Sequence, residues 1–334
     1  MIDILSLNPE ELTEFIIGLN EPKFRSQQVF NWLHVKKESD FSSMGNLPLS
    51  LRKKLESAAV IPTAKQKHKL ESSCGTSKYV FDFNDALVES VYIPNKTGIT
   101  VCVSTQAGCK MGCLICASGK NGFTRNLTPG EMCAQVYAAD NPKSIVLMGS
   151  GEPLDNFENV IKFIDLISHP SGLNIGSRHI TLSTCGLIPE IKRLEKMNKQ
   201  ITLAISLHAS NQKTRESLMP IAKKYTLSDL TAACFSYSET TKRRVSFEYC
   251  LIHEVNNKPQ DAKELCRLLK GMLCHVNIIE LNNNSSAFKK SLKQDTEEFK
   301  RILEENNIPV SIRKSKGSEI QAACGQLINI EKGI

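Results

Sequence analysis

The first sixty residues alternate apolar and polar positions with a helical period. Apolar side chains recur every three to four positions over residues 9–19, 24–35 and 48–58, a spacing that gives a helix one apolar face. The third segment also carries the basic run Arg52-Lys53-Lys54. We therefore expect residues 1–62 to form a small domain of short amphipathic helices.

After residue 62 the pattern becomes typical of β-strands. Residues 78–83 and 87–93 are rich in Val, Tyr, Phe and Ile, and Asn84-Asp85 stands between them. β-Branched and aromatic residues favour strands, and Asn and Asp favour tight turns. These features predict a β-hairpin within residues 63–95 that leads into the rest of the chain.

Short apolar runs alternate with helical stretches in the remainder of the chain. Alternation of this kind predicts parallel strands joined by helices, and six units predict an α/β fold with a partial (β/α)6 barrel over residues 96–308. A doubly wound sheet is the alternative architecture. Residues 309–314 predict an added strand, so residues 309–334 are expected to hold a C-terminal strand and loop. The six barrel strands are expected at residues 99–103, 144–148, 179–183, 201–206, 245–251 and 276–281.

The composition is that of an ordinary globular protein. The chain has 334 residues, of which 41% are hydrophobic and 23% charged, and no apolar run approaches the roughly 20 residues of a membrane span. Residues 1–6 lack the basic and apolar segments of a secretory signal, so we expect a cytoplasmic protein with no membrane partner. The formal charge of +7 suits a polyanionic partner such as a nucleic acid, although such an excess is often only a solvated surface.

Twelve cysteines in a reducing compartment indicate metal binding or catalysis before disulfides. Cys109, Cys113 and Cys116 form a C-x3-C-x2-C triad after the first barrel strand. Three thiolates at this spacing can hold three irons of a 4Fe-4S cluster and leave the fourth iron open. The open iron can bind S-adenosylmethionine (SAM) and pass an electron into its sulfonium bond, which yields a 5′-deoxyadenosyl radical. A structural zinc site is the alternative, but no fourth ligand stands at matching spacing.

Polar residues recur where the predicted strands end, and a barrel enzyme keeps its ligand groups at these ends. After the second strand, Gly151 lets the backbone approach a ligand, and Glu152 can accept hydrogen bonds from the SAM ammonium. Single residues of this type are more often caps or turn residues, but recurrence at four strand ends favours a binding site. The candidate SAM-binding residues are Gly151, Glu152, Ser183, Ser206, Leu207, His208 and Asn282.

Several longer motifs resemble those of a known family. They are Cys102-Val-Ser-Thr-Gln-Ala-Gly-Cys109, Gly122-Phe-Thr-Arg-Asn-Leu-Thr128, Gly151-Glu-Pro-Leu154, Ser206-Leu-His208 and Ala322-Ala-Cys324-Gly-Gln-Leu327. In this combination the chain resembles the RlmN/Cfr family of radical SAM methyltransferases from Phe24 to Gln326, nearly its whole length. The resemblance implies one 4Fe-4S cluster on three cysteines, SAM on the fourth iron, and 23S rRNA and tRNA as substrates.

The resemblance also implies the catalytic residues. Cys324 would accept a methyl group from one SAM, and a second SAM would give the radical that removes hydrogen from this methyl group. The carbon radical would add to carbon 2 of an adenine, in the peptidyl-transferase centre of 23S rRNA or next to the anticodon of tRNA. Glu89 would take the ring proton, and Cys102 would form a transient disulfide with Cys324 to release the product. A reductant such as flavodoxin or ferredoxin would serve a monomeric enzyme.

Four positions depart from the pattern that we expect of this family, namely Ile115, Ser150, Cys185 and Glu280. These changes could alter how the substrate fits without abolishing SAM chemistry. Pro153 after Gly-Glu favours methylation at carbon 2, whereas Cfr-like resistance enzymes methylate carbon 8 and typically carry Ala at this position. Regiochemistry depends on how the base is held, so carbon 8 is the alternative.

Two further hypotheses belong to other classes of protein. An iron-sulfur sensor that binds RNA would need none of Cys324, Cys102 and Glu89. A radical SAM enzyme acting on a protein or small molecule would share the triad and would lose little without the N-terminal helices. The basic segments at residues 52–54, 65–69, 242–244 and 313–316 are candidates for RNA contact, with a solvated surface as the equal alternative. Chemistry on a ring carbon requires an unpaired or extruded base.

Overall fold

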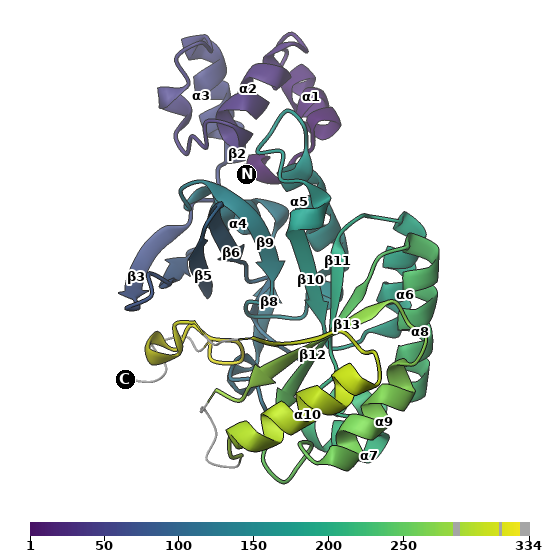
Figure 1. Ribbon diagram of the computed structural model, residues 1–334. Coiled ribbons are helices and arrows are strands. Elements are labelled where there is room, and N and C mark those ends of the chain that lie inside the picture. The colour runs from purple at the N-terminus through teal and green to yellow at the C-terminus, as the bar shows by residue number, and fades with distance from the viewer. Residues whose placement is uncertain (283–287, 314–315, 328–334) are drawn as a thin grey trace.

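One large sheet organises the chain (Figure 1). The computed structural model describes residues 1–282, 288–313 and 316–327, and ten strands of this described part form the sheet. Seven neighbouring strands among them pair in parallel. In order along the sheet they are β6 (Gly98–Cys102), β9 (Pro142–Leu147), β10 (Ile180–Thr184), β11 (Thr202–Ser206), β12 (Val245–Leu251), β13 (Cys274–Glu280) and β14 (Val310–Arg313).

The order of these strands decides between the partial barrel and the doubly wound sheet, the two architectures that the sequence left open. From β6 to β14, neighbours in the sheet follow the order of the chain. A doubly wound sheet reverses its strand order at a switch point, whereas a barrel adds each strand beside the previous one. Strand β14 ends the sheet at one edge and β3 ends it at the other. The fold is therefore a partial (β/α) barrel, as predicted, and β14 is the expected added strand.

Helices flank the parallel strands on the outside of the partial barrel (Figure 1). In α6 the buried residues Ile188, Ile191 and Leu194 follow the helical period and face the sheet. Every position of β12 is buried, as expected for a strand covered on both faces. None of the helices in the described ranges is long and apolar enough to span a membrane. The helices are α4 (Pro129–Tyr137), α5 (Phe157–Ser168), α6 (Ile188–Met197), α7 (Gln212–Leu218), α8 (Leu227–Thr241), α9 (Pro259–Leu269) and α10 (Lys293–Glu305).

The N-terminal segment forms the expected amphipathic helices and packs on the barrel. They are α1 (Pro9–Gly18), α2 (Arg25–His34) and α3 (Leu49–Ala58), and a capping box between Asn8 and Glu11 begins α1. Strands β1 (Ile2–Asp3) and β2 (Ala59–Val60) pair in parallel at the two ends of the segment. On α2 the ring of His34 is hydrogen bonded to the Tyr137 hydroxyl of α4 at 2.7 Å. This contact joins the helical segment to the first helix of the barrel.

The expected hairpin is part of the main sheet. Strands β4 (Ser77–Asp82) and β5 (Leu87–Asn95) pair antiparallel around the Asn84-Asp85 turn, and β5 continues antiparallel to β6. The structure adds a third antiparallel strand, β3 (Lys65–Glu71), beside β4. All seven side chains of β3 are exposed, so the strand has no apolar face for a hydrophobic pattern to detect. Its lysines protect an otherwise open sheet edge.

Candidate active site

A cavity at the carboxyl ends of the parallel strands gathers most of the candidate residues. Cys324, from the C-terminal segment, lies on the wall of the same cavity as the three triad cysteines. Six of the seven candidate SAM-binding residues also line it. The candidates on the cavity wall are Cys109, Cys113, Cys116, Gly151, Glu152, Ser183, Ser206, His208, Asn282 and Cys324.

The triad sits on a loop that is held by its backbone. The Cys109 N–H donates to the Gly122 carbonyl at 2.9 Å, and the Leu114 N–H donates to Leu218 at 2.9 Å. Gly108, with φ of +77°, precedes the triad, and a Cβ there would overlap the Gly122 carbonyl oxygen. The short strands β7 (Gln106–Gly108) and β8 (Phe123–Asn126) close the loop at its two ends. The loop is therefore fixed at both ends while its thiols face the cavity.

The three thiols suit a cluster better than a single ion. Burial raises the pKa of Cys109 to about 11 and that of Cys113 to about 12, and the neighbouring triad thiols also act on Cys113. Thiolates here therefore need a cation to stabilise them. In the described part of the chain, no three His, Cys, Asp or Glu side chains are grouped as ligands of one metal ion. Three nearby but separate thiols fit a 4Fe-4S cluster, because each thiolate takes its own iron.

Glu152 is a rigid acceptor on the cavity wall. Its carboxylate accepts the N–H groups of Leu154 at 3.0 Å and Cys185 at 2.8 Å. Burial raises its pKa above the usual value, and these hydrogen bonds oppose the rise. Gly151, with φ of +105°, lets the loop pass against Gln106, whose side chain would meet a Cβ at 2.6 Å. The carboxylate is therefore fixed in a position where it can receive an ammonium group.

His208 and Leu207 differ in what they can contribute. The His208 Nδ1 accepts the Cys250 N–H at 3.0 Å, so the neutral ring carries its proton on Nε2. Burial, helped by Arg215, lowers the pKa of His208 to about 3 and keeps the ring neutral. Leu207 is fully buried and does not line the cavity. Leu207 could therefore contact SAM only through its backbone atoms.

The segment that carries Cys324 docks against the triad loop. Ala117 N–H donates to the Gly325 carbonyl at 2.8 Å, and the Ser118 hydroxyl donates to the Leu327 carbonyl at 3.0 Å. The Asn282 side chain donates to the Cys324 carbonyl at 3.2 Å. Cys324 itself is exposed on this segment. Residues 314–315 and 328–334 of the expected C-terminal strand and loop lie outside the described residues.

Cys102 and Glu89 lie behind the Cys324 segment on neighbouring strands. Cys102, on β6, packs in a small apolar cluster with Ala322 and Leu327. Burial raises its pKa to about 12, and the nearby Cys324 thiol adds to the rise. Glu89, on β5, is buried and lines a second cavity together with Ser150 and Leu327. The two residues therefore flank the segment, but neither lines the first cavity.

Three charged residues of the first cavity, Glu248, Glu280 and Arg313, were not among the candidate catalytic or binding residues. Glu248 and Arg313 line it as an ion pair at 3.4 Å. Arg313 belongs to a basic segment that we had considered for RNA contact, and the parallel pairing of β14 with β13 brings it into the cavity instead. Another of the four basic segments, residues 242–244, precedes β12 and lies at the opposite end of the strands. Of the four departures from the family pattern, Ile115, Cys185 and Glu280 line the first cavity, and Ser150 lines the second.

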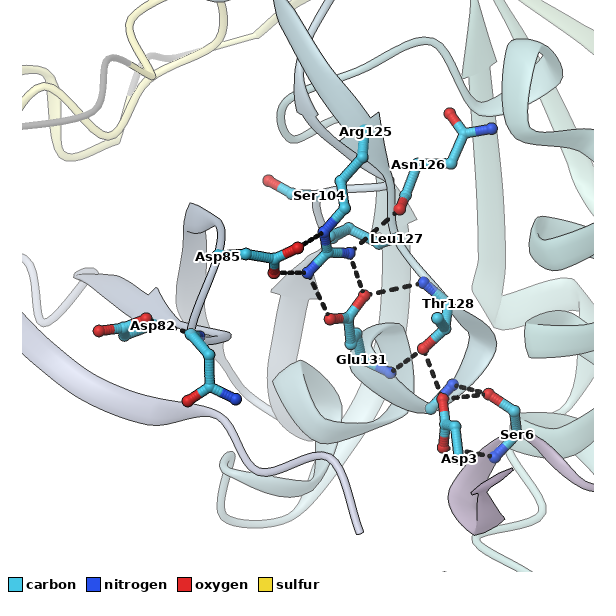
Figure 2. A network of polar contacts seen from close by, with 12 residues as sticks. Asp3, Ser6, Asp82, Asp85, Ser104, Arg125, Asn126, Leu127, Thr128 and Glu131 are labelled. Atoms are coloured by element: carbon cyan, nitrogen blue, oxygen red, sulfur yellow. Dashed lines mark hydrogen bonds and ion pairs between the residues drawn. The ribbon is translucent and has the colours of Figure 1, made fainter. Parts of the chain in front are cut away.

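A polar network fixes the hairpin turn against the barrel and the N-terminus (Figure 2). Arg125, on β8, pairs with Asp85 of the turn at 2.5 Å and with Glu131 of α4 at 2.7 Å. Glu131 caps α4 together with Thr128, whose hydroxyl donates to Asp3 at 2.6 Å. This network thus links the turn before β5, the strand that carries Glu89, to β8, the strand that closes the triad loop.

Comparisons with known proteins identify relatives along the whole chain. Residues 2–61 match the family described as the ribosomal RNA large subunit methyltransferase N-terminal domain, and residues 103–269 match the radical SAM superfamily. The chain is 47% identical over 335 residues to the probable dual-specificity RNA methyltransferase RlmN of Clostridium novyi (strain NT), with 98% of each chain covered. It is 47% identical over 336 residues to the protein of that name from Clostridium botulinum (strain Eklund 17B / Type B), covering 98% of this chain and 96% of the relative.

A solved structure extends the agreement to the whole fold. A radical SAM methyltransferase from Sphaerobacter thermophilus superposes with a TM-score of 0.94 at 39% identity, covering 98% of this chain and 99% of that chain. The superfamily implies a 4Fe-4S cluster and SAM as cofactors, which the thiol set and the Glu152 wall fit. The chain therefore belongs to the RlmN family of radical SAM RNA methyltransferases.

Proposed function

We propose that this enzyme methylates carbon 2 of adenine in 23S rRNA and in tRNA, with Cys324 as the methyl carrier. The observation that carries the proposal is the position of Cys324, exposed on the wall of the cavity that holds the three triad cysteines. Carbon 2 lies between two ring nitrogens and is not nucleophilic, so a methyl group must reach it as a carbon radical. A thiol beside a SAM site is suited to hold that methyl group.

We assign the steps of this chemistry to residues of the chain as follows. The cluster and SAM, when bound by Cys109, Cys113, Cys116 and the wall around Glu152, supply the radical. Cys324 holds the methyl group first and then the bond between protein and RNA. Cys102, packed beside Ala322, is the thiol that attacks the Cys324 sulfur. The new disulfide replaces the bond between that sulfur and the methylene carbon, and this carbon leaves with the electron pair of the broken bond and takes up a proton to become the methyl group of the base.

Glu89 is the proposed general base for the ring proton. Burial raises the pKa of its carboxyl to about 7, and Lys78 opposes the rise. A carboxylate with a pKa near the working pH can take a proton and release it again. Glu89 lines the second cavity, which lies beside the Cys324 segment. Its position supports the second cavity as the place where the adenine enters.

RNA contact is proposed for the helical domain of residues 1–62 and for the edge strand β3. Strand β3 presents Lys65, Lys67 and Lys69, and all three are exposed. Lys67 also lines the Glu89 cavity. Cationic side chains at the rim of a base-binding cavity can hold the phosphates that flank an extruded adenine. The remaining parts of the chain are then the strand extension of residues 63–95, the barrel of residues 96–308 and the carrier segment of residues 309–334.

Nucleoside mass spectrometry tests the proposal directly. Reconstituted protein is incubated anaerobically with SAM, reduced flavodoxin, and either 23S rRNA or tRNA, and the RNA is digested. We expect 2-methyladenosine from both RNAs, and none when Cys324→Ala protein is used. Formation of 8-methyladenosine would overturn the assignment of carbon 2. Cleavage of SAM without methylated RNA would overturn the RNA assignment but leave the triad in place.

A further inference from the structure

We infer that Lys78 is a positioning residue that holds the base Glu89 and the Cys324 segment in one arrangement. The inference rests on the proposed function, since it takes Glu89 as the base and Cys324 as the carrier. Lys78 lies on β4, outside the cavity of the triad, and belongs to none of the motifs that define the family resemblance. Its interactions with Glu89 and with the Cys324 segment carry the inference.

The first interaction is a buried ion pair. Val80 of β4 pairs with Glu89 of β5, so Lys78 is the diagonal neighbour of Glu89 on the same face of the sheet. The Lys78 Nζ lies 3.0 Å from the Glu89 Oε1, and the two side chains are 1% and 3% exposed. Removing two charges from water is unfavourable unless each charge is compensated by a partner. The Glu89 Oε1 has no hydrogen-bond partner among the described residues, so the charge of the Lys78 ammonium is what offsets the burial of this carboxylate.

The second interaction leads to the carrier segment. The same Lys78 ammonium donates to the Gln321 carbonyl at 3.2 Å. Gln321 has φ of +54° and ends the short helix η7 (Ser318–Ile320), three residues before Cys324. The Ala322 N–H that follows returns to the Gly317 carbonyl at 2.8 Å. Lys78 therefore fixes a tight turn of the segment, and the contacts of Ala117 and Asn282 fix its far side.

This arrangement couples the charge of the base to the position of the carrier. When Glu89 takes the ring proton, the ion pair loses its anion, and the ammonium keeps the Gln321 carbonyl as its hydrogen-bond acceptor among the described residues. The other charged groups on the same cavity are Lys67, Asp82 and Asp85. The buried thiol on the neighbouring strand β6 is Cys102. None of these four contributes to the shift of the Glu89 carboxyl, which comes from burial and then from Lys78.

A pH profile separates positioning from a merely structural role. Protein with Cys324 already methylated is mixed with RNA for a single turnover, and the yield of methylated adenine is followed from pH 6 to pH 9. Lys78→Met removes the cation that favours the Glu89 carboxylate, so the pH at which activity begins to rise becomes higher. If the pKa of Glu89 increases by about one unit, the rate at pH 7 falls roughly fivefold and recovers at higher pH. Lys78→Arg keeps the charge and should retain most of the wild-type profile.

Thiol labelling gives a second readout that needs no activity. In protein without cluster, the rate at which iodoacetamide labels Cys324 is measured by peptide mass spectrometry. Lys78→Met should change this rate severalfold, because the turn at Gln321 loses its anchor. Lys192→Met is the matched control, since Lys192 is exposed on α6, on the outside of the barrel, and it should label as the wild type does. If Lys78→Met folds poorly, the double variant Lys78→Met, Glu89→Gln replaces it, because it removes both buried charges. Its Cys324 labelling rate is then compared with that of the wild type.

The outcomes distinguish this inference from the function on which it rests. If the Glu89→Gln protein methylates RNA at the wild-type rate, Glu89 is not the general base. If Glu89→Gln is inactive while Lys78→Met keeps the wild-type pH profile and Cys324 labelling rate, the base stands and the positioning role of Lys78 is wrong.

Discussion

The guanidinium of Arg313 lies 3.4 Å from the Glu248 carboxylate and acts on the thiols of both Cys102 and Cys324. Burial raises the pKa of the Cys102 thiol, desolvation by the surrounding cavity wall raises that of the accessible Cys324 thiol, and Arg313 opposes the rise in each. Glu248 is held in turn by the Asn277 side chain at 2.8 Å. The proposed carrier and resolving thiols therefore share one cation that an ion pair keeps in place.

Substituting Arg313 should slow the methylation of Cys324. Arg313→Met leaves a side chain of similar length but removes the charge that favours the thiolate, and the thiolate is the nucleophile. We expect a loss of roughly tenfold or more in the rate at which Cys324 acquires a methyl group, since each pKa unit corresponds to a factor of ten. Peptide mass spectrometry of the Cys324 peptide measures this rate. Arg313→Lys should lose less, and equal rates in all three proteins would contradict the role.

Cys324→Ala should separate cluster binding from RNA methylation. The substitution leaves the triad and the loop contacts at Ala117 unchanged, so the visible absorbance of the reconstituted cluster should match that of the wild type. SAM cleavage to 5′-deoxyadenosine is expected to continue at a measurable rate, while methylated adenine falls below detection. Methylated RNA at the wild-type level would show that another group carries the methyl.

Cys102→Ala should stop the reaction one step later. Without the resolving thiol, the bond between Cys324 and RNA cannot be released through a disulfide. A covalent protein–RNA adduct is then expected to accumulate as a slowly migrating band that nuclease removes. Cys133→Ala is a suitable control, because Cys133 is also a buried thiol but lies on α4. A Cys102→Ala enzyme that turns over repeatedly would exclude the disulfide step.

The sequence predicts the barrel well because its strands and helices carry strong periodicity. Residues 245–251 are expected as a strand because they are rich in apolar residues that favour strands, such as Val245, Phe247 and Tyr249, and β12 has those bounds. Strand β3 was missed because its seven exposed side chains give no apolar face. Periodicity reports burial, and an edge strand can be wholly exposed.

Site residues are predicted less evenly. The triad spacing is local, so it could be found without the fold. A glutamate on a hairpin strand ordinarily faces solvent, yet Glu89 is 2% exposed. Its partner Lys78 could not be identified, because the register of two strands and the docking of a segment more than two hundred residues away place them together. Arg313 reaches the cavity for the same reason. Charges of this kind acquire their roles only from tertiary pairing.

The contact between the helical domain and the barrel should be sensitive to acid through His34. Burial, and then the nearby His169, lower the pKa of His34 to about 3, so the folded protein binds fewer protons here than the unfolded chain. The stability that His34 contributes is present above about pH 6.5 and is lost as the pH falls towards 3, by up to about 1.4 kcal/mol for each pH unit.

Urea unfolding from pH 7.5 to pH 5 measures this dependence. The difference in free energy of unfolding between wild type and His34→Asn should shrink as the pH falls, because the variant has no group to titrate at this position. His208 is also buried and neutral, but it is present in both proteins and cancels in the difference. A difference that does not change with pH would contradict the assignment to His34.

The network around Arg125 should matter more for the RNA step than for the methylation of Cys324. Arg125→Met breaks the pairs with Asp85 and Glu131 (Figure 2) and leaves the nearly buried Glu131 without its cation, which costs about 1–3 kcal/mol of stability. Asp85→Asn is the matched control for the exposed pair alone and should cost only about 0.2–1 kcal/mol. Since Asp85 lies on the turn that leads into β5, its release loosens the strand that carries Glu89. We expect Arg125→Met to methylate Cys324 at the wild-type rate and RNA severalfold more slowly. Equal losses in both steps would mean that the network supports only the fold.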